Sequence, residues 1–179
     1  MPLDECWKVT SKSPIGTRWI DINKGDVKEP ELRSRLVAKE IKRDNRDDMF
    51  AATPPLEAKK TLFNLAVTSE YGKRTARRKH KKKLLFIDVR RAYVYAAAKR
   101  YVYVVLPDED ASPGMCGKLM KSMYGTRDAA ANWEDEYTSF MMSLGFIPSI
   151  ASPCAFDHPE RDCHLVVHGD YLTFLGNDK

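Results

Sequence analysis

The sequence lacks any long hydrophobic run and any sign of an export signal. Its apolar stretches, such as residues 84–87 and 102–106, fall far short of the roughly 18–20 residues that a membrane-spanning helix needs. Residues 1–5 carry acids and no apolar core, which argues against a secretory signal peptide. We therefore expect a protein that is neither secreted nor inserted in a membrane.

Cysteine is also scarce, and its spacing does not suit a metal site or a disulfide framework. The four cysteines include no CxxC pair. Cys154, His158, Cys163 and His164 cluster along the chain and raise the alternative of a zinc site, but their spacing matches no standard zinc finger. We interpret Cys154 and Cys163 as buried thiols in strand-like segments and expect a reducing compartment.

Positive charge is modest overall but concentrated in one run. The net charge is +5, and 43% hydrophobic with 31% charged residues fits a globular rather than a disordered chain. Residues 73–83 are strongly basic, which is typical of a polyanion partner such as nucleic acid. A solvated surface loop without a partner and a nuclear localisation patch are the alternatives. The candidate nucleic-acid contacts in this run are Arg77, Arg78, Lys79, Lys81, Lys82 and Lys83.

Strands and helices follow one another without regular alternation, which predicts the α+β fold class. Residues 53–55 begin one helix because a threonine is followed by two prolines and, soon after, an acid. Strands are expected within residues 19–23, 32–41, 84–89, 101–106, 154–156, 164–168 and 172–175. The last two enclose Gly169-Asp170 and indicate a hairpin.

Apolar positions predict which side chains form the core. The first helix has an apolar stripe at Leu56, Phe63, Ala66 and Val67. Residues 127–144 form the clearest helix, closed by Gly145. Its core positions recur every three or four residues at Ala130, Trp133, Tyr137, Phe140, Met141 and Leu144. Near the N-terminus, Trp7 and Trp19 are possible anchors.

Two aspartates stand in otherwise apolar strand surroundings. Asp88 ends a segment that we interpret as a buried strand, and Asp170 lies at the predicted hairpin tip. An unpaired buried carboxylate is costly, so a cation partner would explain both. Nucleotidyl transfer uses such carboxylates to hold two metal ions about 3.5–4 Å apart. Aspartates at strand ends and turns are common, so a purely structural role remains the alternative.

Blocks of sequence carry a family resemblance that no single block would establish. They are residues 33–39 (RSRLVAK), 86–93 (FIDVRRAY), 102–107 (VYVVLP), 116–125 (CGKLMKSMYG) continuing to Trp133, 144–146 (LGF) with 152–156 (SPCAF), and 168–176 (HGDYLTFLG). In this order they resemble the motifs of reverse transcriptases from copia-type LTR retrotransposons. The resemblance covers residues 17–176, most of the chain.

The resemblance implies roles for matching residues. Asp88 matches the first metal-binding carboxylate and Asp170 the first aspartate of the hairpin pair, which implies Mg²⁺, or Mn²⁺, as cofactor. Tyr93 matches the aromatic residue that packs under the sugar, with an ordinary core tyrosine as the alternative. Arg35 and Lys39 match residues that meet the incoming triphosphate, with a solvated strand face as the alternative. A further match, Arg127, lies in the template and nucleotide contact segment.

The same resemblance implies a fold and a setting. We expect an N-terminal extension at residues 1–16, a fingers-like region at 17–83 that contains the basic loop 73–83, and a palm at 84–179. The palm would be an antiparallel sheet with helices packed on one face, and the thumb is absent. The implied partners are an RNA template, a DNA primer, dNTPs and the remainder of a polyprotein, in cytoplasmic virus-like particles or the nucleus.

Departures from the family pattern are as informative as matches. Tyr171 stands where the second hairpin aspartate is expected, and a neutral phenol does not replace a carboxylate. Asp128 replaces a glutamine, and Glu40 replaces a glycine. We expect RNA-directed DNA polymerase chemistry in an impaired form. A non-catalytic remnant that binds RNA or DNA is the alternative, and an unrelated α+β binding module is a third possibility.

Overall fold

The structure, a computed structural model, describes residues 1–41, 49–68 and 82–177. The main helices are α1 (Leu3–Thr10), α2 (Leu56–Thr68) and α3 (Ala129–Ser143), with the 3₁₀ helix η2 (Ala92–Tyr95). The strands are β1 (Thr17–Asn23), β2 (Leu32–Ala38), β3 (Lys82–Asp88), β4 (Tyr103–Val104), β5 (Gly117–Lys118), β6 (Ile147–Pro148), β7 (Ala155–His158), β8 (Cys163–His168) and β9 (Tyr171–Asn177). The paired strands are antiparallel, and the predicted α+β class is confirmed.

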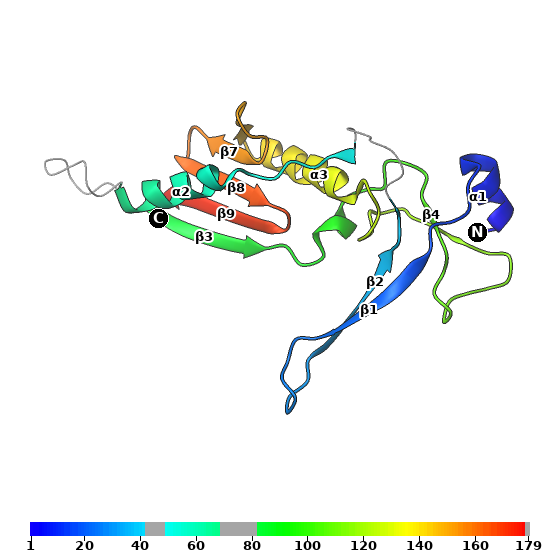
Figure 1. Cartoon of the computed structure of the whole chain (residues 1–179). Coiled ribbons are helices and arrows are strands. Elements are labelled where there is room, and N and C mark those ends of the chain that lie inside the picture. The colour runs from blue at the N-terminus through cyan, green and yellow to red at the C-terminus, as the bar shows by residue number, and fades with distance from the viewer. Residues whose placement is uncertain (42–48, 69–81, 178–179) are drawn as a thin grey trace, which may run out of the picture. The chain divides into compact units, whose positions relative to one another are not determined.

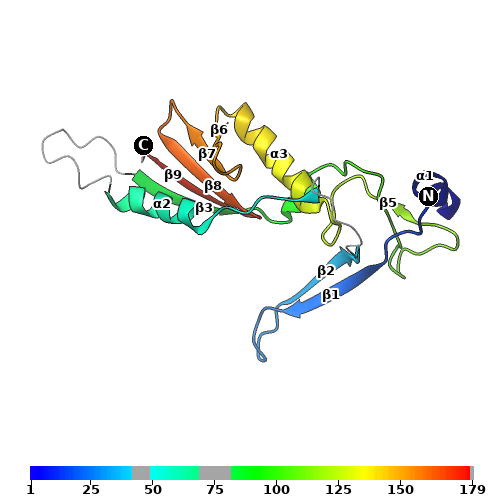
Figure 2. The ribbon, with the colours of Figure 1, turned by 45° about the horizontal axis from the view of Figure 1, so that its top comes forward.

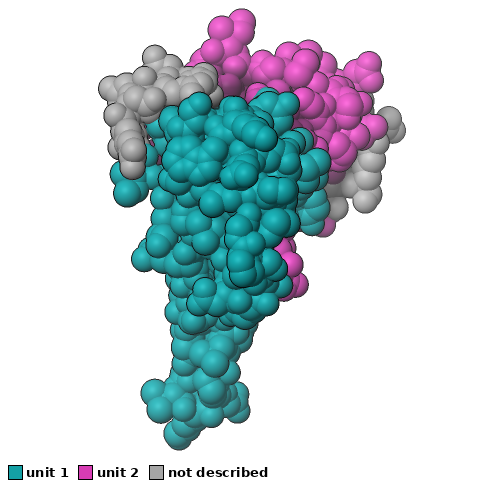
Figure 3. Space-filling model, turned by 90° about the vertical axis from the view of Figure 1, so that its right-hand side faces the viewer, with its two compact units in different colours: residues 1–50, 93–133 teal, residues 51–92, 134–179 magenta. Residues whose placement is uncertain are grey.

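The chain folds into two compact units, each made of two segments. Unit 1 comprises Met1–Phe50 and Tyr93–Trp133, and unit 2 comprises Ala51–Ala92 and Glu134–Lys179, coloured separately in Figure 3. Each unit therefore depends on chain segments that are distant in sequence. The units are described one at a time below.

Unit 2 is built on a five-stranded antiparallel sheet in the order β3-β9-β8-β7-β6 (Figure 1). Directly paired residues of antiparallel strands share a face of the sheet. Leu84 pairs with Leu175, and Leu62 of α2 packs with Leu175 and Val166 on this face. The burial of these aliphatic side chains fixes α2 against the sheet.

The buried face of α2 differs from the predicted stripe. Leu62 is the buried residue of this helix, and Ala58 and Ala66 pack beside it. Phe63 and Val67 are exposed instead, although the Phe63 ring lies 6.3 Å from that of Phe86. Of the predicted stripe, Ala66 alone packs into this cluster, so the prediction was mostly wrong.

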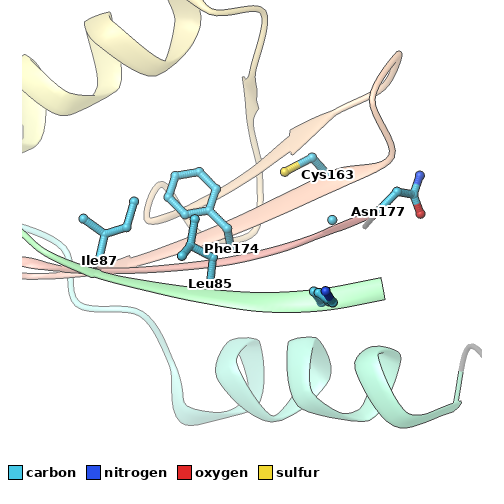
Figure 4. A pocket seen from close by; sticks show the side chains of 7 residues that line it. Leu85, Ile87, Cys163, Phe174 and Asn177 are labelled. Atoms are coloured by element: carbon cyan, nitrogen blue, oxygen red, sulfur yellow. The ribbon is translucent and has the colours of Figure 1, made fainter. Parts of the chain in front are cut away.

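Helix α3 lies against the opposite face of the same sheet (Figures 2 and 4). Its Tyr137 ring stands 6.1 Å from Phe156, edge to face. Phe156 pairs with Leu165, which pairs with Phe174, so these residues define the face away from α2. The expected arrangement, with helices on one face, is therefore wrong, because the strand register gives each helix its own apolar face.

The end of α3 follows the predicted glycine cap. Gly145 has φ 91°, and Phe146 N–H donates to the carbonyl of Met141 at 3.1 Å. Phe146 is buried and contacts the rings of His158 and Phe174. Trp133, Tyr137 and Met141 are buried as predicted, whereas Phe140 and Leu144 are exposed.

Strand β3 is exposed, which corrects the prediction of a buried strand. Among the strands that the structure describes, it forms the edge of the sheet and pairs only with β9. Leu85 is 56% exposed, and Phe86 and Ile87 are also exposed. The face away from α2 carries a hollow of about 290 Å³, and Figure 4 draws the side chains that line it. Its lining residues are Lys83, Leu85, Ile87, Cys163, Phe174, Gly176 and Asn177.

Unit 1 contains the β1–β2 hairpin and a small core around α1. The hairpin pairs seven residues, from Thr17 with Ala38 to Asn23 with Leu32 (Figure 1). Cys6 of α1 is buried with Tyr103 and Cys116. The prediction that two tryptophans anchor this region was wrong, because Trp7 is 49% and Trp19 is 48% exposed. The predicted strand 101–106 is shorter, since pairing is limited to β4.

Candidate functional site

The two predicted metal-binding aspartates are neighbours in unit 2. Asp88 is the last residue of β3, and Asp170 lies in the turn between β8 and β9, where Gly169 has φ 64°. The N–H of Val89 donates to the carbonyl of Asp170 at 2.9 Å. This hydrogen bond ties the end of β3 to the hairpin turn. The fold therefore places both carboxylates at the same end of the sheet.

Tyr171 stands directly opposite Asp88 in the strand register. It is the first residue of β9 and is 58% exposed, so its phenol contributes no core packing that would explain it. Paired residues share a face, which puts the phenol where a third carboxylate would face Asp88. No group of three or more His, Cys, Asp or Glu suited to a metal lies within residues 1–41, 49–68 and 82–177.

The remaining pair fits a divalent cation of the magnesium type. Mg²⁺ prefers hard oxygen ligands and is usually held by one or two carboxylates together with water and substrate phosphates. Asp88 is exposed and Asp170 is partly exposed, so solvent and phosphate oxygens have access to both. The histidines and Cys163 of the zinc alternative lie at the other end of β8 and do not all share a face: Cys163 pairs with His158 on one face, while His164 belongs to the other face and contacts Asp157.

A cationic contact that sequence reasoning missed lies on the same face as Asp88. His168 pairs with Tyr171, which pairs with Asp88, so the three share one face across neighbouring strands. The Nζ of Lys59, on α2, is 2.6 Å from the Nδ1 of His168. A sequence signal existed for the histidine, which begins the hairpin motif. The lysine becomes its neighbour only through the packing of α2 on the sheet.

In unit 1, Tyr124 joins two of the predicted nucleotide-binding residues. Its ring is 4.6 Å from that of Tyr93, and the guanidinium of Arg35 lies 5.6 Å from its centroid. Offset aromatic pairs and cation–π contacts of this kind each stabilise an arrangement by about 1 kcal/mol. Tyr124 was missed as an individual residue, although it belongs to the motif block ending at Gly125.

Gly125 lets the chain pass close to the end of β2. It has φ 86°, and a Cβ added there would lie 1.9 Å from the carbonyl oxygen of Ala38. The N–H of Ala38 donates to the carbonyl of Tyr124 at 2.8 Å. Any side chain at this position would collide with backbone. Glycine is therefore required to bring Tyr124 beside the strand that carries Arg35.

One face of the β1–β2 hairpin presents a row of cations. Arg33 and Arg35 alternate along β2, and Arg18 stands on the same face opposite Val37. Lys39 continues the row, since its N–H donates to the carbonyl of Gly16 at 2.8 Å. All four cationic side chains are exposed. Sequence reasoning found Arg35 and Lys39 but missed Arg18 and Arg33, because only the strand register aligns them.

The family departures Glu40 and Asp128 converge on one arginine in unit 1. Arg100 Nη1 donates to Glu40 Oε1 at 2.8 Å, and its Nη2 donates to Asp128 Oδ1 at 2.8 Å. The predicted contact Arg127 joins them through its backbone N–H, 2.9 Å from Glu40 Oε2. Burial opposes ionisation of Asp128, but the hydrogen bond and charge of Arg100 outweigh it and hold the pKa of Asp128 below its usual value.

The basic run is only partly within the described residues. Arg77, Arg78, Lys79 and Lys81 lie outside them, and their predicted role stays a prediction. Lys82 Nζ donates to Asp162 at 2.8 Å, and this contact, against the effect of burial, lowers the pKa of Asp162. Lys83 lines the hollow of Figure 4. The charge of Lys82 is thus matched locally, which weakens its assignment as a nucleic-acid contact.

The candidate residues fall into two groups, one in each unit. Asp88 and Asp170 belong to unit 2, whereas Arg35, Lys39 and Tyr93 belong to unit 1 together with Arg127. Each group is locally organised by hydrogen bonds or ring contacts of its own unit. No helix within the described parts of the chain has the length and apolar character needed to cross a membrane.

Comparison with known proteins gives a consistent result over most of the chain. The family described as "Reverse transcriptase (RNA-dependent DNA polymerase)" matches residues 5–173. The chain is 23% identical over 179 residues to the "Retrovirus-related Pol polyprotein from transposon TNT 1-94" of Nicotiana tabacum, covering 94% of this chain and 13% of that protein.

Two proteins of Arabidopsis thaliana are also similar to this chain. The Retrovirus-related Pol polyproteins from transposons RE1 and RE2 are each 25% identical over 175 residues, which is 92% of this chain and 11% of either relative. The chain thus spans only a small part of the length of these curated relatives. No solved structure shows a significant match.

Proposed function

The chain belongs to the reverse transcriptase (RNA-dependent DNA polymerase) family, and from this premise we propose that it is the nucleotidyl-transfer portion of a copia-type retrotransposon polyprotein, in an impaired form. The observation that carries the proposal is the adjacency of Asp88 and Asp170. Two carboxylates at one end of a sheet suit metal binding, and relatives named as Pol polyproteins favour that use over a purely structural one.

The carboxylates would act by holding metal and substrate oxygens in place. Magnesium bound by Asp88 and Asp170, or manganese in its place, would lower the barrier by stabilising the charge that develops on the attacking and leaving oxygens. Exposure of Asp88 keeps the pair accessible to a primer end and to phosphates. Neither carboxylate is engaged by a described cationic side chain in an ion pair, so both remain available to a cation.

The residues of unit 1 would bind the nucleotide. Arg35 and Lys39 are exposed cations on one strand face and suit the triphosphate of a dNTP. Tyr93 would pack under the sugar, and its contact with Tyr124 supports that role by limiting the motion of the ring. The guanidinium of Arg35 also lies over the Tyr124 ring. Tyr124 would therefore position both the phosphate contact of Arg35 and the sugar contact of Tyr93.

The cation row of the β1–β2 hairpin would bind the phosphates of the template strand. Arg18 and Arg33 extend the row beyond the two residues assigned to the triphosphate. Arg33 already pairs with Glu31 at 2.6 Å, so Arg18 is the stronger candidate. Removing one phosphate contact to a single strand reduces the salt dependence of log affinity by about 0.7.

The salt dependence gives a direct test of this surface. Arg18→Ala should lower the slope of log affinity against log salt by about 0.7 for single-stranded RNA. Lys8→Ala, which removes an exposed cation from α1 in the same unit, is the matched control and should leave the slope unchanged. Equal slopes for the native chain and Arg18→Ala would remove the hairpin face from the binding surface.

Impaired chemistry follows from Tyr171. The phenol opposite Asp88 lacks the paired carboxylate oxygens that an aspartate would offer to a metal. Extension of a DNA primer on an RNA template, with Mg²⁺ and dNTPs, tests the proposed activity. We expect slow incorporation that disappears in Asp88→Asn. Incorporation that survives Asp88→Asn would show that the activity does not come from this site.

The alternative is a non-catalytic remnant that binds RNA or DNA. The same Tyr171 favours it, since a lineage that no longer needs polymerase chemistry would tolerate loss of a carboxylate while keeping the cation row. The two functions separate in a single comparison. If the native chain and Tyr171→Asp both fail to extend a primer but bind the template with a steep salt dependence, the remnant reading is correct.

A further inference from the structure

We propose that Arg100 is a positioning residue that locks the end of β2 to the segment of residues 124–128, and thereby fixes the backbone that carries Lys39 and Tyr124. The inference deepens the proposed nucleotide-binding role of unit 1 and rests on it for its functional meaning. The structural lock itself is independent of that function. Nothing in the family resemblance assigns a role to Arg100.

The guanidinium of Arg100 binds both acids at once. Its Nη1 and Nη2 donate to the two carboxylate oxygens of Glu40, which is the bidentate arrangement. The same Nη2 also donates to Asp128 Oδ1 at 2.8 Å. Asp128 Oδ2 in turn accepts from Asn132 Nδ2 at 3.1 Å. One cation therefore connects the end of β2 with the first turn of α3.

All three side chains are largely removed from solvent. The exposed fractions are 29% for Arg100, 15% for Glu40 and 10% for Asp128. Burial lowers the pKa of Arg100, but its hydrogen bonds to Asp128 and Glu40 outweigh burial and raise that pKa above its usual value. Both carboxylates bind the same arginine nitrogen. Without Arg100, these two shielded negative charges would lie close together with no cationic partner and would repel each other.

The lock acts on backbone that the nucleotide site needs. Glu40 directly follows Lys39, and its N–H donates to the carbonyl of Gly125 at 3.3 Å. Its Oε2 also accepts the backbone N–H of Arg127 at 2.9 Å. The Glu40 carboxylate, held by Arg100, thus fixes both sides of the approach between β2 and the Gly125 turn. Lys39 lies on one side of this approach and Tyr124 on the other.

The lock also explains why two departures from the family pattern occur together. A glutamate in place of glycine and an aspartate in place of glutamine would each add a negative charge near bound polyanions. Arg100 provides a shared counter-charge for both, so neither acid is left unpaired. If Arg100 stabilised this region independently of the two acids, its removal would have the same effect whatever residues stood at positions 40 and 128. If Arg100 acts by binding the two acids, its removal should matter only when both acids are present.

Hydrogen exchange of backbone amides measures the lock directly. The amides of Ala38, Lys39, Glu40 and Arg127 are followed in the native chain and in Arg100→Met, and again in the Glu40→Gly/Asp128→Gln background with and without Arg100→Met. In the native background, we expect Arg100→Met to speed exchange of these amides by about tenfold or more. In the double-substituted background, the same change should alter exchange by less than about twofold.

Two outcomes overturn the proposal. One is equal acceleration in both backgrounds, which would make Arg100 a general stabilising residue. The other is unchanged exchange in the native background. If Arg100→Met fails to fold, Arg100→Lys replaces it, since lysine keeps the charge but lacks the fork that binds Glu40 and Asp128 together. Exchange in Arg100→Lys should then rise by about threefold, and unchanged exchange would reject the lock.

A second measurement distinguishes failure of this inference from failure of the proposed function. The affinity for dATP with Mg²⁺ is measured for the native chain and for Arg100→Lys, and we expect it to fall by about tenfold in the variant. If the native chain binds no dATP, the proposed nucleotide-binding role is wrong, while the exchange data still decide whether the lock exists. If dATP binds equally well to both proteins although exchange has accelerated, the lock does not serve the nucleotide site.

Discussion

Two regions of the molecule carry residues that we interpreted as departures from the reverse transcriptase pattern, and their surroundings in the structure differ. In unit 1, Glu40 and Asp128 are unusual acids, and both are bound by Arg100 in a shielded network. In unit 2, Tyr171, which we interpreted as standing in place of an aspartate, pairs with Asp88 in the strand register, and its side chain is largely exposed. The two acids are bound by a charged partner, whereas the structure shows no charged partner for Tyr171 among the residues that it describes.

The difference teaches what a substitution costs in each setting. An acid in a shielded position is costly unless it is paired, so the stability of unit 1 depends on the Arg100 network. An exposed side chain at a hairpin start contributes little to stability, so we expect unit 2 to tolerate either tyrosine or aspartate at position 171. We therefore expect substitutions in the Arg100 network to change mainly stability, and substitutions at Tyr171 to change mainly the proposed chemistry.

Loss of Arg100 should give the largest effect on stability. Arg100→Met leaves Glu40 and Asp128 shielded and unpaired, and we expect the free energy of unfolding to fall by about 3–5 kcal/mol. Denaturant titration measures it. In the Glu40→Gly/Asp128→Gln background, the same change should cost less than about 1 kcal/mol. Similar losses in the two backgrounds would mean that the acids are not compensated by this residue.

A side chain at Gly125 should give the next largest effect. Gly125→Ala combines a positive φ with a collision against the carbonyl of Ala38, and we expect a loss of about 2–3 kcal/mol. Gly114→Ala is the matched control, because its φ is 71° and a Cβ there would meet nothing within 4 Å. The control should lose only about 1 kcal/mol. Equal losses of stability in Gly125→Ala and Gly114→Ala would show that the close approach between β2 and the Gly125 turn adds no cost of its own.

Low pH should lower the free energy of unfolding of unit 1 by less than the substitution of Gly125 does. The folded pKa of Asp128 is lower than its usual 3.8, so its stabilising contribution is present above pH 3.8 and is lost as the pH falls through the folded value. We expect a loss of about 1 kcal/mol in that window. Asp128→Asn should flatten the stability curve there. A curve below pH 4 that is unchanged by Asp128→Asn would contradict the assignment.

The hairpin tyrosine should give the smallest effect on stability. Tyr171→Phe removes only a hydroxyl from an exposed ring, and we expect the free energy of unfolding to stay within about 0.5 kcal/mol of the native value. Thermal unfolding is sufficient to measure it. A loss above about 2 kcal/mol would show that the phenol has a structural partner, and unit 2 would then resemble unit 1.

Much of the fold and the family could be predicted from residues with strong local signals. Gly145 predicted the end of α3, and Gly169-Asp170 between two apolar runs predicted the β8–β9 hairpin. The α1 helix was missed although Asp4 and Glu5 in its first turn and Lys8 in its last favour a helix. The order of the motif blocks identified the family, because ordered matches along a chain do not depend on knowing the fold.

Long-range features were beyond sequence reasoning. An apolar run such as residues 84–87 reads the same at the edge of a sheet as at its centre, so the exposure of β3 was not foreseen. The placement of α2 and α3 on opposite faces depends on the register of several strands. Arg100 lies 60 residues from Glu40 and 28 from Asp128, and no local pattern connects them.

The central claim is that Tyr171 is an uncompensated loss at an otherwise assembled carboxylate site. Primer extension on an RNA template with Mg²⁺ tests it most directly, with the native chain and Tyr171→Asp measured side by side. The matched control is Glu40→Gly/Asp128→Gln/Arg100→Met, which changes the compensated region and should gain nothing. We predict that Tyr171→Asp extends the primer on the order of a hundredfold faster than the native chain. Equal rates for these two proteins would contradict the account.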